Sequence, residues 1–272
     1  MGVGGTVIFV SNEERKNMIF DSHAHYDDKQ FEEDRHELLS SMGEKNVGKI
    51  VNVGASIVGS KRTLELAEKY DFVYAAIGVH PSDIECLDEV GMQWLRQAAE
   101  HPKVAAIGEI GLDYYWEKES EVREQQKEWF RRQLQLAREV NLPVIIHSRD
   151  AAADTMEIMK KDAQGISGVI HCFSYSKEIA REYVKMGYYI GVGGVITFKN
   201  GKKLRETVEE IPLESIVIET DCPYLAPEPY RGKRNSSERL SYVVEEIARI
   251  KGVTVEEVEK VTFENAMRLY RL

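Results

Sequence analysis

The stretch Met18-Ile19-Phe20-Asp21-Ser22-His23-Ala24-His25 joins a short apolar run to two histidines that stand two residues apart. An apolar run of this kind predicts a buried β-strand, and side chains two residues apart on a strand point the same way. His23 and His25 are therefore expected to project together from one strand end. Two imidazoles in that arrangement can ligate a divalent metal ion if other parts of the chain complete the site.

Short apolar runs recur seven more times along the chain, and segments with helical periodicity separate them. The eight predicted strands cover residues 18–20, 49–54, 72–77, 104–107, 144–146, 168–170, 188–192 and 216–218. Strands that alternate with helices form parallel sheets, because a parallel partner requires a crossover connection. Eight such units predict an α/β protein with a closed (β/α)8 TIM barrel, and an open doubly wound sheet is the alternative. Two extra C-terminal helices are expected over about 236–251 and 254–270.

The 272 residues are enough for one large domain, which we expect to span residues 18–272. Residues 1–17 precede a second methionine, Met18, and are expected to be an extension outside the fold, disordered or from a non-native start. The formal net charge of −10 argues against broad nonspecific binding to nucleic acid, which usually shows as a basic surplus, but it does not exclude a nucleic-acid enzyme.

The cysteine content and the hydropathy pattern predict a cytoplasmic protein. Cys86, Cys172 and Cys222 are too few and too scattered to form a disulfide framework, so a reducing cytosol fits. No apolar stretch approaches the roughly 20 residues that span a bilayer. The apolar run at residues 6–10 lacks the basic flank of a signal peptide. We therefore expect neither secretion nor membrane insertion.

Polar residues that can bind metal ions stand at the carboxyl ends of six of the eight predicted strands. They are His23, His25, His80, Glu109, His147, His171 and Asp221. In a barrel these strand ends converge on one face, where active sites are built. Histidines scattered over a surface would show no such preference, so the positions together predict a single site.

Four histidines, one glutamate and one aspartate are enough for two metal ions that share a bridging ligand. A carboxylate can bridge two ions with its two oxygens, whereas a neutral imidazole offers one lone pair. We therefore assign Glu109 as the bridge. The other ligands form two sets, His23, His25 and Asp221 for one ion and His147 and His171 for the second.

Two ions about 3.5–4 Å apart would stabilise the attacking and leaving oxygens of a hydrolysis and lower the pKa of a bound water. Asp221 is both a ligand and a nearby carboxylate, so it could accept the proton of that water, and Asp221 and Glu109 are the predicted catalytic residues. Mixed nitrogen and oxygen ligation favours zinc, manganese, iron or cobalt over magnesium, without deciding among these metals.

Four residues near the predicted ligands have other expected roles. His80 either lines the substrate pocket or is a buried histidine in a turn. Asp21 is expected to orient His23 or the backbone at the strand end. Cys172 and Cys222 directly follow two ligands, so in extended chain they should point away from the site, as core thiols.

Six motifs in this order resemble the TatD family of metal-dependent deoxyribonucleases, within the amidohydrolase-like barrels. They are residues 21–25 (DSHAH), 78–81 (GVHP), 108–114 (GEIGLDY), 147–151 (HSRDA), 171–174 (HCFS) and 219–225 (ETDCPYL). The resemblance implies a (β/α)8 barrel, two divalent ions (Zn²⁺, Mn²⁺ or Mg²⁺) held by the residues assigned above, and hydrolysis of DNA, often as a 3′-to-5′ exonuclease.

One departure from the family pattern lies after the last strand. Family members commonly have Arg-x-x-Arg-Asn followed by Glu-Pro, whereas here residues 231–235 (RGKRN) run into Ser236-Ser237. The metal residues are unaffected, but the loop lacks a carboxylate and a rigid proline, so the local fit to substrate is expected to differ.

Basic residues gather in two loops on the predicted active face. They are Lys199, Lys202, Lys203 and Arg205 after the seventh strand, and Arg231, Lys233 and Arg234 after the eighth. Barrel phosphate sites often use these loops, and phosphate contacts hold a nucleic acid without reading its sequence. Arg149 is a better candidate than Lys202 or Lys203, which could be a solvated face; the alternative for Arg149 is a salt bridge to Asp150 or a neighbouring loop.

Three functions remain open from the sequence. The first is a two-metal deoxyribonuclease with DNA as its substrate. The second is an amidohydrolase or lactonase that attacks a small carbonyl substrate with the same metal pair. The third is a metal-binding protein without catalysis that binds a partner. The physiological metal, the polarity of digestion, the preference for DNA over RNA and the oligomeric state do not follow from the residues.

Overall fold

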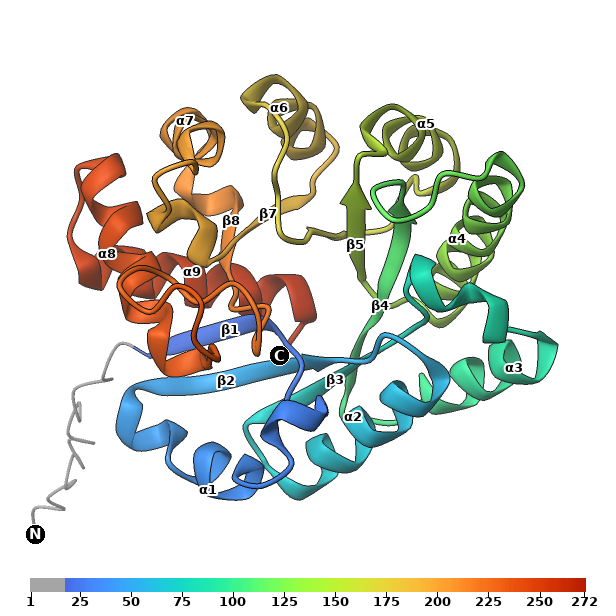
Figure 1. Cartoon of the computed structure of the whole chain (residues 1–272), viewed down its shortest axis with the longest axis horizontal. Coiled ribbons are helices and arrows are strands. Elements are labelled where there is room, and N and C mark those ends of the chain that lie inside the picture. Colours follow the sequence, from blue (N-terminus) through green and yellow to red (C-terminus); the bar gives the residue numbers. More distant parts are fainter. Residues whose placement is uncertain (1–17) are drawn as a thin grey trace, which may run out of the picture.

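The structure is a computed structural model that describes residues 18–272; the extension expected at 1–17 lies outside the described residues. Eight parallel strands follow one another in sequence order around a nearly closed barrel, surrounded by helices (Figure 1). The strands are β1 (Ile19–Ala24), β2 (Val47–Val53), β3 (Val73–Ile77), β4 (Val104–Asp113), β5 (Val144–Arg149), β6 (Gly168–Ile170), β7 (Tyr189–Val192) and β8 (Ile216–Ile218). The predicted TIM barrel is confirmed.

Helices connect the strands and cover the outside of the barrel. The α-helices are α1 (Arg35–Ser40), α2 (Ile57–Lys69), α3 (Glu89–Ala98), α4 (Ser120–Val140), α5 (Ala152–Asp162), α6 (Lys177–Lys185), α7 (Lys202–Glu210), α8 (Leu240–Lys251) and α9 (Val255–Tyr270). The short 3-10 helices are η1 (Lys29–Phe31), η2 (Met42–Lys45), η3 (Pro81–Cys86), η4 (Gly194–Thr197), η5 (Leu213–Ser215) and η6 (Ser237–Arg239). Within the described residues, no helix is both long and apolar enough to cross a membrane.

The seam between β8 and β1 is closed by the chain that follows β8. The backbone N–H of Asp221 donates to the carbonyl of His23 at 2.9 Å, and the N–H of His25 donates to the carbonyl of Cys222 at 2.9 Å. These two hydrogen bonds join the last strand of the barrel to the first. They also place Asp221 beside the two histidines of β1.

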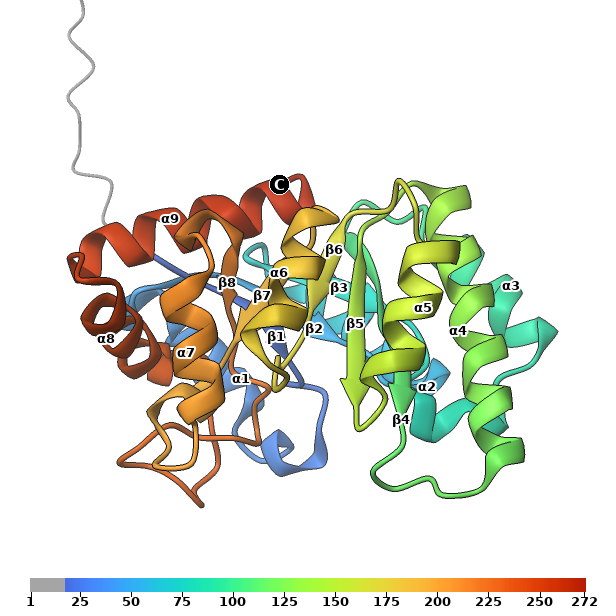
Figure 2. The same ribbon diagram turned by 90° about the horizontal axis from the view of Figure 1, so that it is seen from above.

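Helix α9 lies across the end of the barrel where the strands begin, opposite to the loops that follow the strand tips (Figure 2). Its residues Leu269 and Tyr270 join Phe20 of β1 in an apolar cluster that fills this end. The Tyr270 hydroxyl donates to the carbonyl of Ser22 at 2.8 Å, so its polar atom is satisfied in the core. Burial of each such side chain contributes roughly 1.5–3 kcal/mol.

The two extra C-terminal helices are confirmed, with one shifted boundary. Gly252 ends α8 in the left-handed conformation at φ +68°, and the Thr254 side chain accepts from the backbone N–H of Glu257 at the start of α9. Residues 237–239 form η6 instead of the first turn of α8. The Ser237 hydroxyl donates to Asp21 at 2.6 Å, and this tertiary contact holds the segment outside the regular helix.

Strand β4 is longer than predicted, because ten residues rather than four are extended. Gly111 pairs with His147 of β5 at φ +144°. A Cβ atom on Gly111 would lie 1.9 Å from the His147 carbonyl oxygen, so only glycine lets the two strands approach here. The longer strand places Glu109 within β4 rather than after it.

Candidate metal centre

A cavity of about 840 Å³ opens at the carboxyl ends of the strands, where the sequence predicts the site. The predicted ligands that line it are His25, Glu109, His147, His171 and Asp221, and His80 lines it as well. His23 is completely buried directly beside His25. The predicted convergence of all seven side chains on one face is therefore confirmed.

His23 and His25 point to the same place, as the strand period predicts, with their Nε2 atoms 3.0 Å apart. The Nδ1 of His25 lies 2.8 Å from the carbonyl of Val53. Because a carbonyl can only accept, this nitrogen carries the proton, and neutral His25 keeps the lone pair of Nε2 for a metal. Asp221 Oδ1 lies 3.3 Å from that Nε2.

Glu109 lies between the histidines, with each oxygen facing different ones. Its Oε2 is 3.5 Å from Nε2 of His23 and 3.8 Å from Nε2 of His25. Its Oε1 is 2.7 Å from Nδ1 of His147 and 3.6 Å from Nε2 of His171. A carboxylate surrounded in this way can serve two groups of nitrogen ligands at once.

His171 lies closer to the first predicted ligand set than to His147. Its ring stacks on that of His23 with centroids 3.6 Å apart, whereas the centroid of His147 is 6.3 Å away. Its Nε2 is 3.9 Å from Asp221 Oδ1. His171 thus lies within 4 Å of both Glu109 and Asp221.

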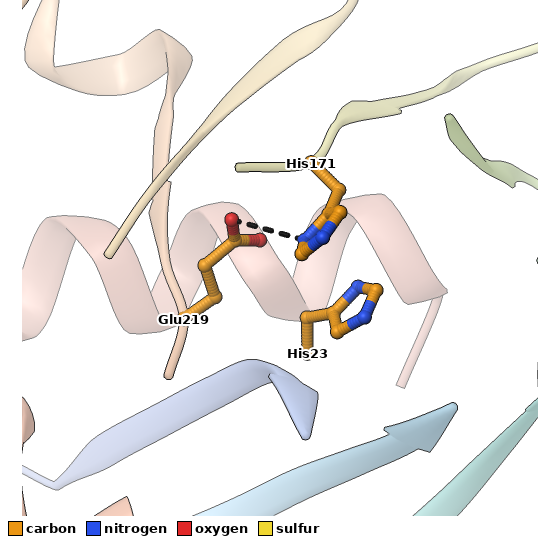
Figure 3. Close-up of side chains that lie close together, drawn as sticks. All are labelled: His23, His171 and Glu219. Atoms are coloured by element: carbon orange, nitrogen blue, oxygen red, sulfur yellow. Dashed lines mark ion pairs between the residues drawn. The ribbon is translucent and has the colours of Figure 1, made fainter. Parts of the chain in front are cut away.

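Glu219, which the sequence reasoning missed, stands behind His171. Figure 3 shows its carboxylate directed at the His171 ring, with His23 beside the pair. Oε1 lies 3.1 Å from Nδ1 of His171 and accepts the backbone N–H of Cys172. The contact with the ring is an ion pair rather than a well-aligned hydrogen bond. A carboxylate at Nδ1 leaves Nε2 as the ligating atom, as in many metal sites.

The position of Glu219 depends on a glycine in the neighbouring strand. Glu219 is 1% exposed, and a Cβ atom on Gly191 of β7 would lie 2.5 Å from its Oε2. One sequence feature could have revealed this carboxylate: it stands two residues before Asp221, as Asp21 stands two residues before His23.

Asp113 is a second carboxylate that the sequence reasoning did not assign. Its Oδ2 lies 3.2 Å from Nε2 of His147, so both ring nitrogens of His147 face a carboxylate. Its Oδ1 accepts the backbone N–H groups of Tyr115 and Trp116 at 2.9 and 3.3 Å. Asp113 therefore links the metal centre to the loop that follows β4.

His80 combines the two roles that the sequence left open. Its Nδ1 accepts the backbone N–H of Ser82 at the start of η3, which is a turn contact. Its Nε2 faces the cavity, 3.8 Å from Glu109 Oε1. With Nδ1 accepting, neutral His80 carries its proton on Nε2 and can donate it to a bound group.

Asp21 supports the strand end, as predicted. It is completely buried and accepts the N–H groups of His23 at 3.3 Å and Thr220 at 3.0 Å, and burial raises its pKa to about 6. Ser237, which stands where family members have other residues, donates its hydroxyl to Asp21 and contacts the Tyr26 hydroxyl at 2.8 Å. The serine that departs from the family pattern thus helps to hold Asp21 at the end of β1.

The prediction for the cysteines is correct for one and wrong for the other. Cys222 is completely buried in the core. Cys172 instead lines the cavity, with its sulfur within 4.8 Å of ligand atoms of His171 and Asp221. The cause is its positive φ of +45°, because a residue in the left-handed conformation breaks the alternation on which the prediction rested.

The carboxylates of Glu109 and Asp221 stay ionised although they are buried. Burial disfavours the charge on Glu109, but His171 and the other nearby histidines hold its pKa well below its usual range. Burial acts in the same way on Asp221, where the contacts with His25 and His171 lower the pKa. Both groups are therefore available as anionic ligands near neutral pH.

The pKa values of the imidazoles differ according to the carboxylates near each ring. Burial disfavours their charged forms, yet Asp221 raises the pKa of His25 to about 9, and Glu219 raises that of His171 to about 10. Burial lowers the pKa of His80 to about 4, so it stays neutral. A metal ion that binds His25 or His171 has to displace protons from them.

The candidates for substrate contact do not all lie at the cavity. His80 and Arg149 line it, whereas none of the seven basic residues in the loops after the seventh and eighth strands does. Arg234 pairs with Asp34, and Arg231 lies over the ring of Phe198. The salt bridge from Arg149 to Asp150 that the sequence left open is not found among the described residues.

The donor set fits divalent metal ions. Ionised buried carboxylates face imidazole nitrogens within 4 Å, and groups of three such residues, among them His23, His25 and Glu109, bring their ligand atoms within 4.8 Å of one another. Such a mixture of nitrogen and oxygen donors is typical of zinc, manganese and other transition-metal sites.

Comparison with known proteins agrees with this site. The family described as TatD related DNase matches residues 20–271. The metal-dependent hydrolase YabD of Bacillus subtilis is 47% identical over 256 residues, 94% of this chain and 100% of YabD. The metal-dependent hydrolase YcfH of Escherichia coli K12 is 37% identical, over 93% of this chain and 96% of YcfH.

The fold is also found in a solved structure of a relative. The crystal structure of YjjV, a TatD homolog from Escherichia coli K12, has a TM-score of 0.87 at 32% identity and covers 93% of this chain and 98% of that one. The family resemblance of the sequence motifs is thereby confirmed. This chain belongs to the TatD family and is a metal-dependent hydrolase.

Proposed function

We propose that this protein is a two-metal deoxyribonuclease that hydrolyses phosphodiester bonds of DNA, and that it works as a 3′-to-5′ exonuclease. The observation that carries the metal count is the position of Glu109. One of its oxygens faces His23 and His25, and the other faces His147 and His171, all within 3.8 Å. This arrangement suits a carboxylate that bridges two ions. The family description supports DNA as the substrate.

The residues around the ions have distinct roles in this proposal. Bound divalent ions would supply Lewis-acid polarisation of the phosphodiester and a water of lowered pKa. Asp221, ionised and facing the cavity, accepts the proton of the attacking water. His80 donates its Nε2–H to a phosphoryl oxygen, and Arg149 pairs with a phosphate at the cavity mouth.

The test uses pure protein and oligonucleotides labelled at the 5′ or the 3′ end, with Mg²⁺, Mn²⁺ or Zn²⁺ added after chelation. We expect shortening from the 3′ end that stops with chelator and with Glu109→Gln. A matched control is Glu121→Gln, an exposed residue of α4. Absence of cleavage with every metal would contradict the proposal, and shortening from the 5′ end would contradict its polarity.

One observation favours a second function, hydrolysis of a small carbonyl substrate. Among the described residues that line the cavity, Arg149 is the one Lys or Arg, whereas carboxylates such as Asp27 and Asp28 add negative charge to the lining. A polyanion would usually meet more positive charge. Turnover of lactones or aryl esters that survives Arg149→Ala, together with no cleavage of DNA, would establish this alternative.

A further inference from the structure

Two large aromatic side chains stand exposed at the edge of the metal cavity. Tyr115 and Trp116, in the loop between β4 and α4, are 43% and 70% exposed. Their rings meet edge to face with centroids 4.7 Å apart, and Trp116 lines the cavity. An exposed tryptophan at a cavity mouth offers a wide apolar face to whatever enters.

The loop that carries the aromatic pair is tied to the metal centre. Asp113 accepts the N–H groups of Tyr115 and Trp116 through Oδ1, while its Oδ2 faces His147. The Nζ of Lys118 donates to the carbonyl of Tyr114 at 2.9 Å and braces the same loop. These contacts hold the backbone of the loop in place beside His147.

Arg149 completes the group from β5. Its guanidinium carbon lies 3.9 Å from the ring centroid of Tyr115 and 5.7 Å from that of Trp116. Within the described part of the chain, no carboxylate or carbonyl takes a hydrogen bond from the guanidinium of Arg149. Stacking fixes the plane of the guanidinium, and its N–H donors stay available for an anion.

We propose that Tyr115, Trp116 and Arg149 form a nucleotide subsite, in which one nucleobase next to the cleaved bond stacks on Trp116 and its phosphate pairs with Arg149. An aromatic face beside an unpaired guanidinium matches a planar group that carries an anion, and a nucleotide is such a group. The proposal rests on the proposed nuclease function and adds a binding position to it.

The size of the effect follows from base stacking in other proteins. Removal of one aromatic platform weakens binding by roughly 5- to 150-fold per base, whatever the base, because every base has a π-face. We therefore expect Trp116→Ala to raise KM for DNA within this range with little change in kcat. Trp116→Phe should retain most of the binding.

The test scans an abasic nucleotide through the four positions nearest the cleaved end. At one position, removal of the base should weaken binding to the parent protein as much as Trp116→Ala weakens binding of normal DNA. With the abasic nucleotide at that position, Trp116→Ala should not weaken binding any further. The control variant is Trp129→Phe, a tryptophan on α4 with Arg132 over its ring and away from the cavity. The subsite would be overturned if Trp116→Ala weakened binding of normal and abasic DNA equally, or weakened neither.

A binding measurement separates this proposal from the nuclease activity. Thymidine monophosphate should quench the fluorescence of Trp116 in the Mg²⁺-loaded protein, whereas inorganic phosphate should not. The quenching should disappear in Trp116→Phe and weaken in Arg149→Ala, while the two other tryptophans report the fold. Quenching without DNA cleavage would uphold the subsite and reject the nuclease. Cleavage that is accompanied by neither quenching nor an effect of the abasic nucleotide would reject the subsite alone.

Discussion

The two ends of the barrel are made by the same eight strands and are built in opposite ways. At the end where the strands begin, α9 seals an apolar cluster that includes Phe20 and Leu269. At the other end His23, Glu109 and Glu219 are buried to nearly the same degree, although they are polar. Apolar burial at the first end stabilises the fold, whereas the buried polar groups at the second end are costly unless they face one another or a ligand. Stability and chemistry are thus separated along the barrel axis.

The largest effect is expected from Glu109→Gln at the polar end. The amide keeps the shape but cannot bridge two cations as an anion, so hydrolysis should fall on the order of 1,000-fold or more. Metal titration by calorimetry should show at least one ion lost, and far-UV circular dichroism should stay unchanged. Activity within tenfold of the parent protein would reject Glu109 as the central ligand.

The opposite result is expected from Leu269→Ala at the sealed end. This substitution removes a buried side chain and leaves a cavity, so the free energy of unfolding should fall by about 2–5 kcal/mol. Activity per folded molecule should be retained, as measured by denaturant titration beside turnover. Val90→Ala, at a side chain 72% exposed, is the control and should cost less than about 0.5 kcal/mol. A loss of activity without a loss of stability would contradict the separation of the two ends.

Glu219→Gln tests the support behind the metal ligands. The amide can still accept from the N–H of Cys172, but it loses the charge beside His171, so metal affinity should weaken roughly 10- to 100-fold. Nitrogen NMR should show a changed tautomer or a lowered pKa of His171, which a merely structural role would not produce. Glu214→Gln, at an exposed position before β8 and away from the site, is the matched control. Unchanged affinity and an unchanged His171 spectrum would remove Glu219 from the site.

The last expected effect is that of pH on metal affinity, which is the smallest when it is counted per proton and per pH unit. Without an ion, the pKa values of His25 and His171 are raised to about 9 and 10, so both side chains are protonated at pH 7. Because a metal ion displaces those protons, its affinity should rise with pH, by roughly tenfold per pH unit for each proton released, until the pH passes these pKa values. Calorimetry between pH 6 and 8 in buffers of different ionisation enthalpy measures the released protons. An affinity independent of pH would show that the histidines are neutral before binding.

The sequence by itself determined the order of the strands and brought the predicted ligands to one face of the barrel. The bounds 168–170 and 216–218 match β6 and β8, because short apolar runs between turns are a local property. His23 and His25 were paired correctly from the two-residue period of a strand alone. Their convergence with Asp221 then followed from parallel topology, which brings all strand ends to one face.

Only the tertiary structure decided which atoms meet. The inward turn of Cys172 depends on the φ angle of one residue, and the contact of Glu219 with His171 joins segments nearly fifty positions apart. The stacking of Arg149 on Tyr115 likewise joins the end of β5 to the loop after β4 through their three-dimensional positions. Periodicity reports which side of a strand a residue occupies, but the distance between two such residues is set by how the whole barrel closes.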